Sequence, residues 1–126
     1  MDTKPISELH AEHTEWLNKL DFYNDELIMM RERIQNVAAK NTGKDILAKI
    51  EHFQNQIIVQ RNNIDEFRHA IKDHENYLEH RIDENPVASD HRKVHDHPKL
   101  RETMESFEKI FNGIRHELNE FLAKVL

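Results

Sequence analysis

The feature that most constrains this chain is a heptad spacing of core-type residues, which recurs in three separate segments. Within each segment the spacing alternates between three and four residues without a slip, as in α-helices that bury one narrow stripe. We call each stripe a seam. The first seam consists of Leu9, His13, Trp16, Leu20, Tyr23, Leu27, Met30, Ile34 and Val37. The second consists of Ile46, Ile50, Phe53, Ile57, Gln60, Ile64, Phe67, Ile71, His74 and Leu78. The third consists of Leu100, Met104, Phe107, Phe111, Ile114, Leu118, Phe121 and Val125.

Chain-breaking residues between the seams predict helices at about residues 6–40, 44–83 and 98–126. The turn after the first helix is so short that the second helix must run antiparallel to the first. Pro86 ends the second helix, because the residue before a proline avoids the α region, and Pro98 suits the first turn of the third. Residues 84–97 are the predicted connection, and the pattern leaves open whether residues 88–96 add a short helix. We therefore predict an all-α, antiparallel three-helix bundle (up-down-up) with coiled-coil-like heptad packing, in one domain covering residues 1–126.

The composition agrees with a bundle and argues against several kinds of protein. Apolar residues make up 37% of the chain and charged residues 33%, which suits long helices that each bury one stripe. No cysteine is present, so neither a disulfide framework nor a thiolate metal site is expected. The net charge of -6 disfavours binding to nucleic acid. No apolar run reaches the roughly 20 residues of a membrane span, and no signal peptide is visible, so we expect a soluble cytoplasmic protein.

The sequence contains no recognisable catalytic motif. Gly43 and Gly113 stand alone, so no glycine-rich phosphate loop is present. The serines lie outside any nucleophile-elbow context. We therefore expect a non-enzymatic protein without a resident cofactor.

Two polar residues near the middle of their seams suggest a register for the first hairpin. If Val37 faces Ile46, then Tyr23 faces Gln60 across the same layer. A buried unpaired polar group would cost about 1–3 kcal/mol, so we predict a Tyr23–Gln60 hydrogen bond that fixes the register. The alternative is that each side chain reaches water separately.

The seams also predict where the bundle is incompletely covered. If Leu78 faces Leu100, the tip of the first hairpin overhangs the third helix by about two turns and is covered from one side only. Five further apolar residues lie off the seams at similar heights, namely Phe22, Ile28, Met29, Ile58 and Val59. A patch of this kind favours a homodimer or the docking of another helical protein. The alternative is that three-helix packing recruits these residues into a wider buried stripe.

The histidines are concentrated at one end of the predicted bundle. Antiparallel topology brings the start of the first helix, the end of the second helix and the second connection together. The candidate metal ligands in these regions are His10, His13, His74, His91 and His95. Imidazole is the commonest protein ligand for metals, and converging rings with a carboxylate hold zinc or another divalent ion. The alternative is that His13 and His74 close the polar end of the seam by hydrogen bonding to each other or to the backbone.

The leading prediction is therefore a non-enzymatic bundle that acts through protein–protein contact, most simply as a homodimer. The second prediction is a metal-binding protein whose site lies at the histidine-rich end.

Overall fold

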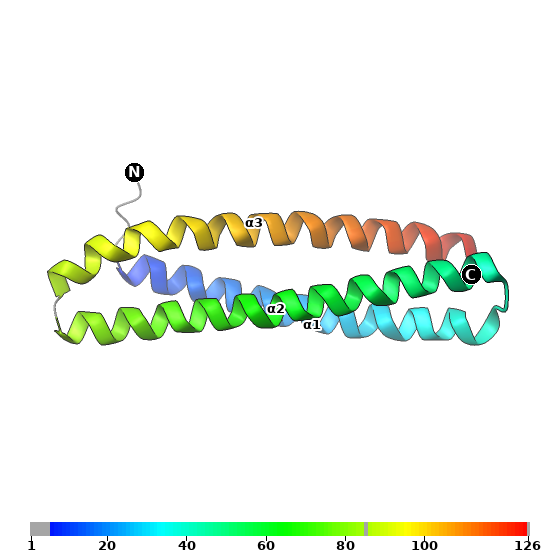
Figure 1. Ribbon diagram of the computed structural model, residues 1–126, viewed down its shortest axis with the longest axis horizontal. Helices are drawn as coiled ribbons and strands as arrows, with labels where there is room; N and C mark the ends of the chain where they lie inside the picture. Colours follow the sequence, from blue (N-terminus) through cyan, green and yellow to red (C-terminus); the bar gives the residue numbers. More distant parts are fainter. Residues whose placement is uncertain (1–5, 85, 126) are drawn as a thin grey trace.

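The fold is known from a computed structural model that describes the backbone of residues 6–84 and 86–125 and the side chains of residues 8–76 and 98–125. Three long helices make up this part of the chain: α1 (Ile6–Lys40), α2 (Lys44–Glu84) and α3 (Pro86–Val125). They lie side by side as an elongated bundle, running up, down and up (Figure 1). α1 packs most closely against α2. The predicted all-α three-helix bundle is confirmed.

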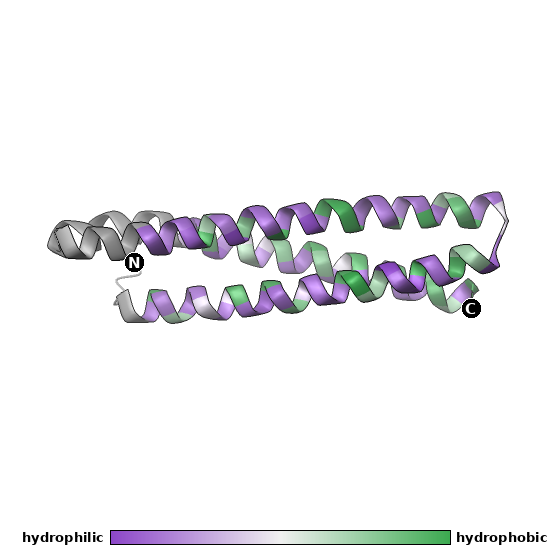
Figure 2. Ribbon diagram, turned by 90° about the horizontal axis from the view of Figure 1, so that it is seen from below, coloured by the Kyte–Doolittle hydropathy of each residue, from purple (hydrophilic) through white to green (hydrophobic). Residues whose placement is uncertain are grey.

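The seams form the core of this bundle. Every predicted seam residue of α1 is buried, from Leu9 to Val37. In α2 the seam is buried from Ile50 to Ile71. Hydrophobic residues recur at short intervals along all three helices, with charged and polar residues between them (Figure 2). The largest fully buried side chains include Leu20, Ile64 and Phe111, one from each helix, so the three seams meet in a single core.

The α1–α2 turn is held by two short-range hydrogen bonds. The side-chain amide of Asn41 donates to the carbonyl of Val37 at 2.8 Å, which satisfies an acceptor that the end of α1 leaves open. The carbonyl of Gly43 accepts from the backbone N–H of Leu47 at 3.0 Å and so begins the hydrogen-bond ladder of α2. The turn therefore ends one helix and starts the next within three residues.

The third helix starts earlier than the sequence predicts. α3 begins at Pro86 and passes through Pro98, so residues 86–97 are helical rather than a connection. Proline suits the first position of a helix, and the proline at that position of α3 is Pro86 rather than the predicted Pro98. Inside α3, Pro98 has no N–H to donate to the carbonyl of Val94, which makes it an unfavourable residue there.

Three ion pairs spaced by seven residues link α1 to α3, and we call them the α1–α3 ladder. They are Glu12–Arg101 at 3.1 Å, Lys19–Glu108 at 3.7 Å and Glu26–Arg115 at 2.5 Å. In each pair the two residue numbers differ by 89. The two parallel helices therefore keep a constant register over two heptads. Because the middle pair has the opposite polarity to its neighbours, a slip of one heptad would bring like charges together.

The predicted overhang at the α1–α2 tip is too long by about one turn. Ile34, Val37 and Ile50 are at most 3% exposed and so are covered on all sides, whereas Ile46 is only partly buried. Near the end of α3, Phe121 lies against Phe53 with ring centroids 5.4 Å apart, and Leu122 is buried in place of the predicted Phe121. The pairing of Leu78 with Leu100 that the seams suggested would place Val125 opposite Phe53, so α3 reaches about one turn further toward the tip than predicted. At the opposite end, α2 and α3 run past the start of α1 (Figure 1).

Candidate functional site

A carboxylate of α2 joins two histidines near the start of α1. His10 and His13 lie one turn apart on α1, and Glu75 lies opposite them on α2. The Nδ1 atom of His10 is 2.7 Å from Oε2 of Glu75, and the Nδ1 atom of His13 is 2.5 Å from Oε1. His13 is buried, with 1% of its side chain exposed, whereas 61% of the His10 side chain is exposed. One carboxylate group thus ties a surface ring and a core ring to the neighbouring helix.

His74 completes this group of side chains. Its ring meets the His13 ring edge-on, with centroids 5.1 Å apart and planes at 76°. The His13 ring also lies near the ring of Trp16, with centroids 5.6 Å apart. We call His10, His13, His74 and Glu75 the histidine cluster. Its contacts are those of an aromatic and hydrogen-bonded layer that closes the apolar core.

The structure brings together three of the five predicted metal ligands. His10, His13 and His74 converge as predicted, but both hydrogen-bonded rings use Nδ1 to contact Glu75. The side chains of His91 and His95 lie outside the described residues. Within residues 8–76 and 98–125, no group of three or more histidine, cysteine or acidic side chains is placed to hold a metal ion. The metal site therefore stays a prediction.

Tyr23 makes a different hydrogen bond from the predicted one. Its hydroxyl donates to Oε2 of Glu108 on α3, at 2.7 Å, and not to Gln60 on α2. Burial, followed by the hydrogen bond to this carboxylate, raises the pKa of Tyr23 to about 12. Gln60 is 5% exposed, and its Oε1 atom accepts no hydrogen bond from any described group. The predicted Tyr23–Gln60 pair is therefore wrong, because a charged acceptor on α3 lies within reach of the phenol.

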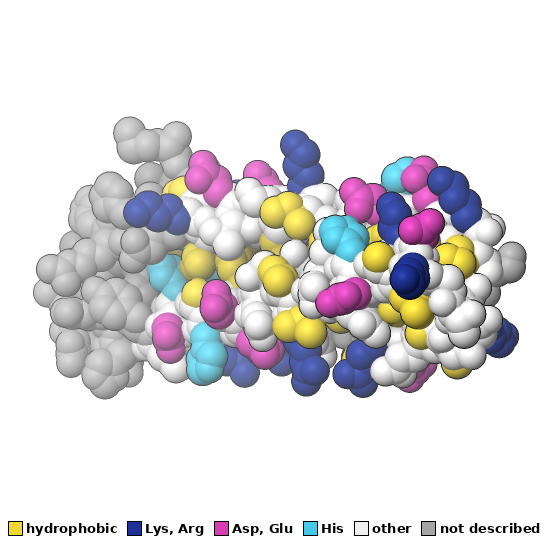
Figure 3. Space-filling view, turned by 45° about the vertical axis from the view of Figure 1, so that its right-hand side comes forward, with side chains coloured by type: hydrophobic (Ala, Val, Ile, Leu, Met, Phe, Trp, Pro, Cys, Tyr) yellow, Lys and Arg dark blue, Asp and Glu magenta, His cyan; other side chains and the backbone are white. Residues whose placement is uncertain are grey.

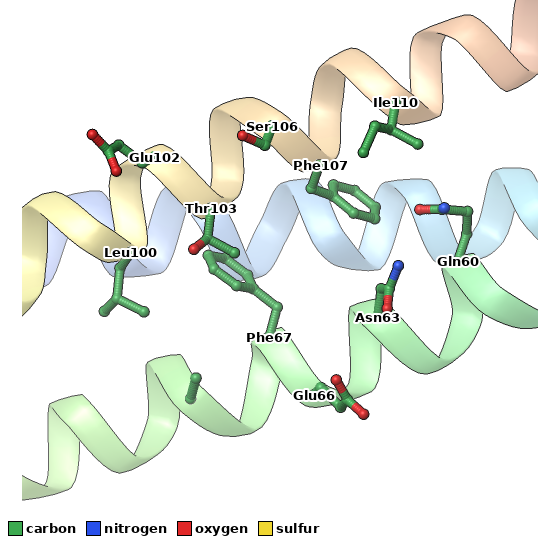
Figure 4. Close-up of a pocket in the computed structure, with 11 residues that line it drawn as sticks. Gln60, Asn63, Glu66, Phe67, Leu100, Glu102, Thr103, Ser106, Phe107 and Ile110 are labelled. Carbon is green, nitrogen blue, oxygen red and sulfur yellow. The ribbon is translucent and has the colours of Figure 1, made fainter.

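Gln60 marks a groove along the α2–α3 face. Two adjoining hollows of about 620 Å³ and 440 Å³ lie on this face, and Gln60 and Ile110 line both of them. Phe67 and Phe107 form part of the floor between the two helices, while Glu66 and Glu102 lie toward the outside (Figure 4). Both hollows are open to solvent. We call them together the α2–α3 groove.

The walls of the groove make no polar contact with each other. Along residues 52–70 of α2 and 102–117 of α3, the described side chains form no hydrogen bond or ion pair across the two helices. The Oε1 atom of Gln56, like that of Gln60, is buried without a hydrogen-bond partner. By contrast, the α1–α3 face is closed by its ladder, and the α1–α2 face by Arg68 with Asp21 and by Glu75 with its two histidines. Among the described residues, the groove is thus the helix–helix face that no ion pair crosses, although α2 packs more closely against α3 than α1 does.

The apolar residues predicted to lie off the seams are indeed exposed. Their exposed fractions run from 45% for Ile28 to 62% for Phe22, so they are not recruited into a wider buried stripe. They do not line one common hollow: Phe22 lines a hollow on α1, Ile28 lines one between α1 and α2, and Val59 lines the α2–α3 groove. On one side of the bundle, apolar side chains are visible between charged ones (Figure 3).

The sequence reasoning missed Glu75 and Ile110, although signals for both were present. Arg68 and Glu75 are seven residues apart, and each follows a seam residue directly. Both reach α1, so this heptad position of α2 consistently faces the first helix. Ile110 is 55% exposed, directly precedes the seam residue Phe111, and lines the hollow between α3 and α2. Reading the positions beside the seams, as well as the seams, would have found both residues.

Comparisons with protein-family models, with curated proteins and with solved structures find no match to this chain. None of the helices in the described part of the chain has the length and apolar character needed to cross a membrane.

Proposed function

We propose that the protein acts without catalysis, through protein–protein contact, and that the α2–α3 groove receives a further helix. The observation that carries this proposal is that exposed apolar residues line this groove and no ion pair among the described residues crosses it, whereas ion pairs cross the other two helix–helix faces. Val59 and Ile110 are 52% and 55% exposed at its edges, so an apolar side chain of each helix faces solvent there. A groove between two antiparallel helices is the site that a fourth helix occupies in a four-helix bundle.

The fourth helix comes either from a second copy of this chain or from a different protein. In both cases the helix would cover the exposed edges of Val59 and Ile110 and the floor around Phe107. Binding would therefore remove apolar surface from water, which is the dominant favourable contribution to most protein association.

The test uses a charge placed in the groove and the same charge placed elsewhere. Self-association is measured by sedimentation equilibrium, and the binding of amphipathic helical peptides by fluorescence anisotropy. We expect Ile110→Glu to abolish whichever interaction the wild-type chain shows. Phe22→Glu is the matched control, because Phe22 is equally exposed but lies on α1, and it should leave the interaction unchanged. A wild-type chain that neither self-associates nor binds any such peptide would contradict the proposal.

A further inference from the structure

The charges around the α2–α3 groove distinguish it from the other two faces. Three glutamates line it, Glu66, Glu102 and Glu117, and no lysine or arginine stands among the described residues that line the two hollows. On the α1–α2 face, by contrast, Arg31 and Arg61 line the hollow. The groove therefore combines an apolar floor with an acidic edge.

The buried amides beside the groove do not add to this charge. The Oε1 atoms of Gln56 and Gln60 accept no hydrogen bond from the described part of the chain, but they are buried within the protein and so are closed to an occupant of the groove. The preference for a cationic occupant therefore rests on the three glutamates that line the groove.

From these observations we infer that the occupant of the α2–α3 groove is a basic amphipathic helix of a different protein. This inference rests on the proposed function and names its partner by chemistry. The lining of the groove runs along α3 from Leu100 to Glu117, which corresponds to about 25 Å at 1.5 Å per residue. The partner is therefore a helix of about five turns, with apolar residues at spacings of three and four and lysine or arginine on both flanks.

A second copy of the chain fits the groove less well. In a two-fold symmetric dimer the same surface patch contributes from both copies. The groove of one copy would then bring its three glutamates against the three glutamates of the other, and like charges facing each other across an interface oppose association. The net charge of -6 adds to this repulsion.

The test compares two designed peptides of 18 residues that share one apolar stripe. One carries lysine and arginine on its flanks, and the other carries glutamate at the same positions. Fluorescence anisotropy with the full chain measures both affinities at low salt. We expect the basic peptide to bind about tenfold more tightly than the acidic one, and the difference to shrink as salt screens the charges.

Two double variants that change the net charge by the same amount show where the preference for the basic peptide arises. Glu66→Lys combined with Glu117→Lys should remove the preference for the basic peptide, whereas Glu32→Lys combined with Glu51→Lys, at exposed positions outside the lining of the groove, should leave it intact. Circular dichroism checks that each variant keeps its helices.

Three results would overturn the inference, and they separate it from the proposed function. Equal binding of both peptides, lost in Ile110→Glu, would leave a helix-binding groove without charge selection. A wild-type dimer that Ile110→Glu makes monomeric would identify a second copy as the occupant. In both cases the proposed function would stand. Absence of any peptide binding and of any self-association would remove the proposed function as well.

Discussion

At the scale of single residues, Glu75 is the side chain on which the histidine cluster depends. Its two oxygens bind a buried ring, His13, and an exposed ring, His10. Glu75→Ala takes an acceptor from the buried ring, and we expect a loss of about 1–3 kcal/mol in the free energy of unfolding, measured in urea. His10→Ala is the control, because it breaks only the exposed contact and should cost less than about 1 kcal/mol. Equal losses in the free energy of unfolding for the two variants would mean that the burial of His13 does not strengthen its contact with Glu75.

The partner of Tyr23 is tested by a double-mutant cycle. Tyr23→Phe and Glu108→Ala remove the donor and the acceptor of one hydrogen bond, so we expect a coupling of about 1 kcal/mol between them in urea unfolding. Tyr23→Phe and Gln60→Leu should be additive within about 0.5 kcal/mol, because those residues are not hydrogen-bonded. Coupling in the second cycle and additivity in the first would instead support the Tyr23–Gln60 hydrogen bond that the seams suggested.

The raised pKa of Tyr23 gives the folded state a dependence on alkaline pH. The phenol ionises near 10 in the unfolded chain and at about 12 in the folded one. The folded protein therefore retains this proton to higher pH, and the associated stability is complete below about pH 10 and lost as the pH rises to about 12. Urea unfolding across this range should show a steeper decline for the wild type than for Tyr23→Phe. An identical decline with pH in both proteins would contradict the raised pKa of Tyr23.

Polar partners at this scale were the hardest features to predict from the sequence. The seams correctly placed His13, Tyr23 and Gln60 in the core. They did not reveal the partners, because a heptad position specifies the height and the side of a side chain and not which of two neighbouring helices it reaches. Tyr23 had a candidate amide on α2 and a carboxylate on α3, and a charged acceptor makes the stronger hydrogen bond.

At the scale of helices, the start of α3 is the element boundary most open to test. If α3 begins at Pro86, then Pro98 lies inside a helix, where proline is about 3 kcal/mol less favourable than alanine. Pro98→Ala should then stabilise the protein, by about 1–3 kcal/mol after relaxation of the neighbouring turn. If the helix began at residue 98, proline would already suit that position and the substitution would give no gain. Thermal unfolding followed by circular dichroism distinguishes the two results.

Helix boundaries were predictable where a break is unambiguous. Lys40 and Lys44 border a turn of three residues, and the predicted and observed ends agree. Between the second and third seams, the chain offers two prolines and a polar stretch without a clear seam. Local rules allow either proline to start a helix there, so only the packing of the whole α2–α3 hairpin decides which one does.

At the scale of the whole molecule, the burial of the two ends fixes how the three helices are aligned. The seams predicted three helices of unequal reach, because they assigned residues 84–97 to a connection. Once α3 starts at Pro86, the α2–α3 hairpin is tight, and α3 shifts by about one turn toward the α1–α2 tip. At the other end, the backbones of α2 and α3 extend beyond the start of α1 (Figure 1).

This alignment predicts that the core at Ile34, near the tip of the bundle, is as stable as the core at its centre. Ile34, near the tip, and Ile64, near the centre, are both 0% exposed. Replacing a fully buried isoleucine by alanine costs about 2–5 kcal/mol, through lost transfer energy and the cavity that remains. We therefore expect Ile34→Ala and Ile64→Ala to lower the free energy of unfolding by similar amounts, measured in urea. Under the overhanging arrangement, Ile34 would be covered from one side only, and its substitution would cost much less than that of Ile64. A clearly smaller loss at Ile34 would therefore show that α3 does not cover Ile34.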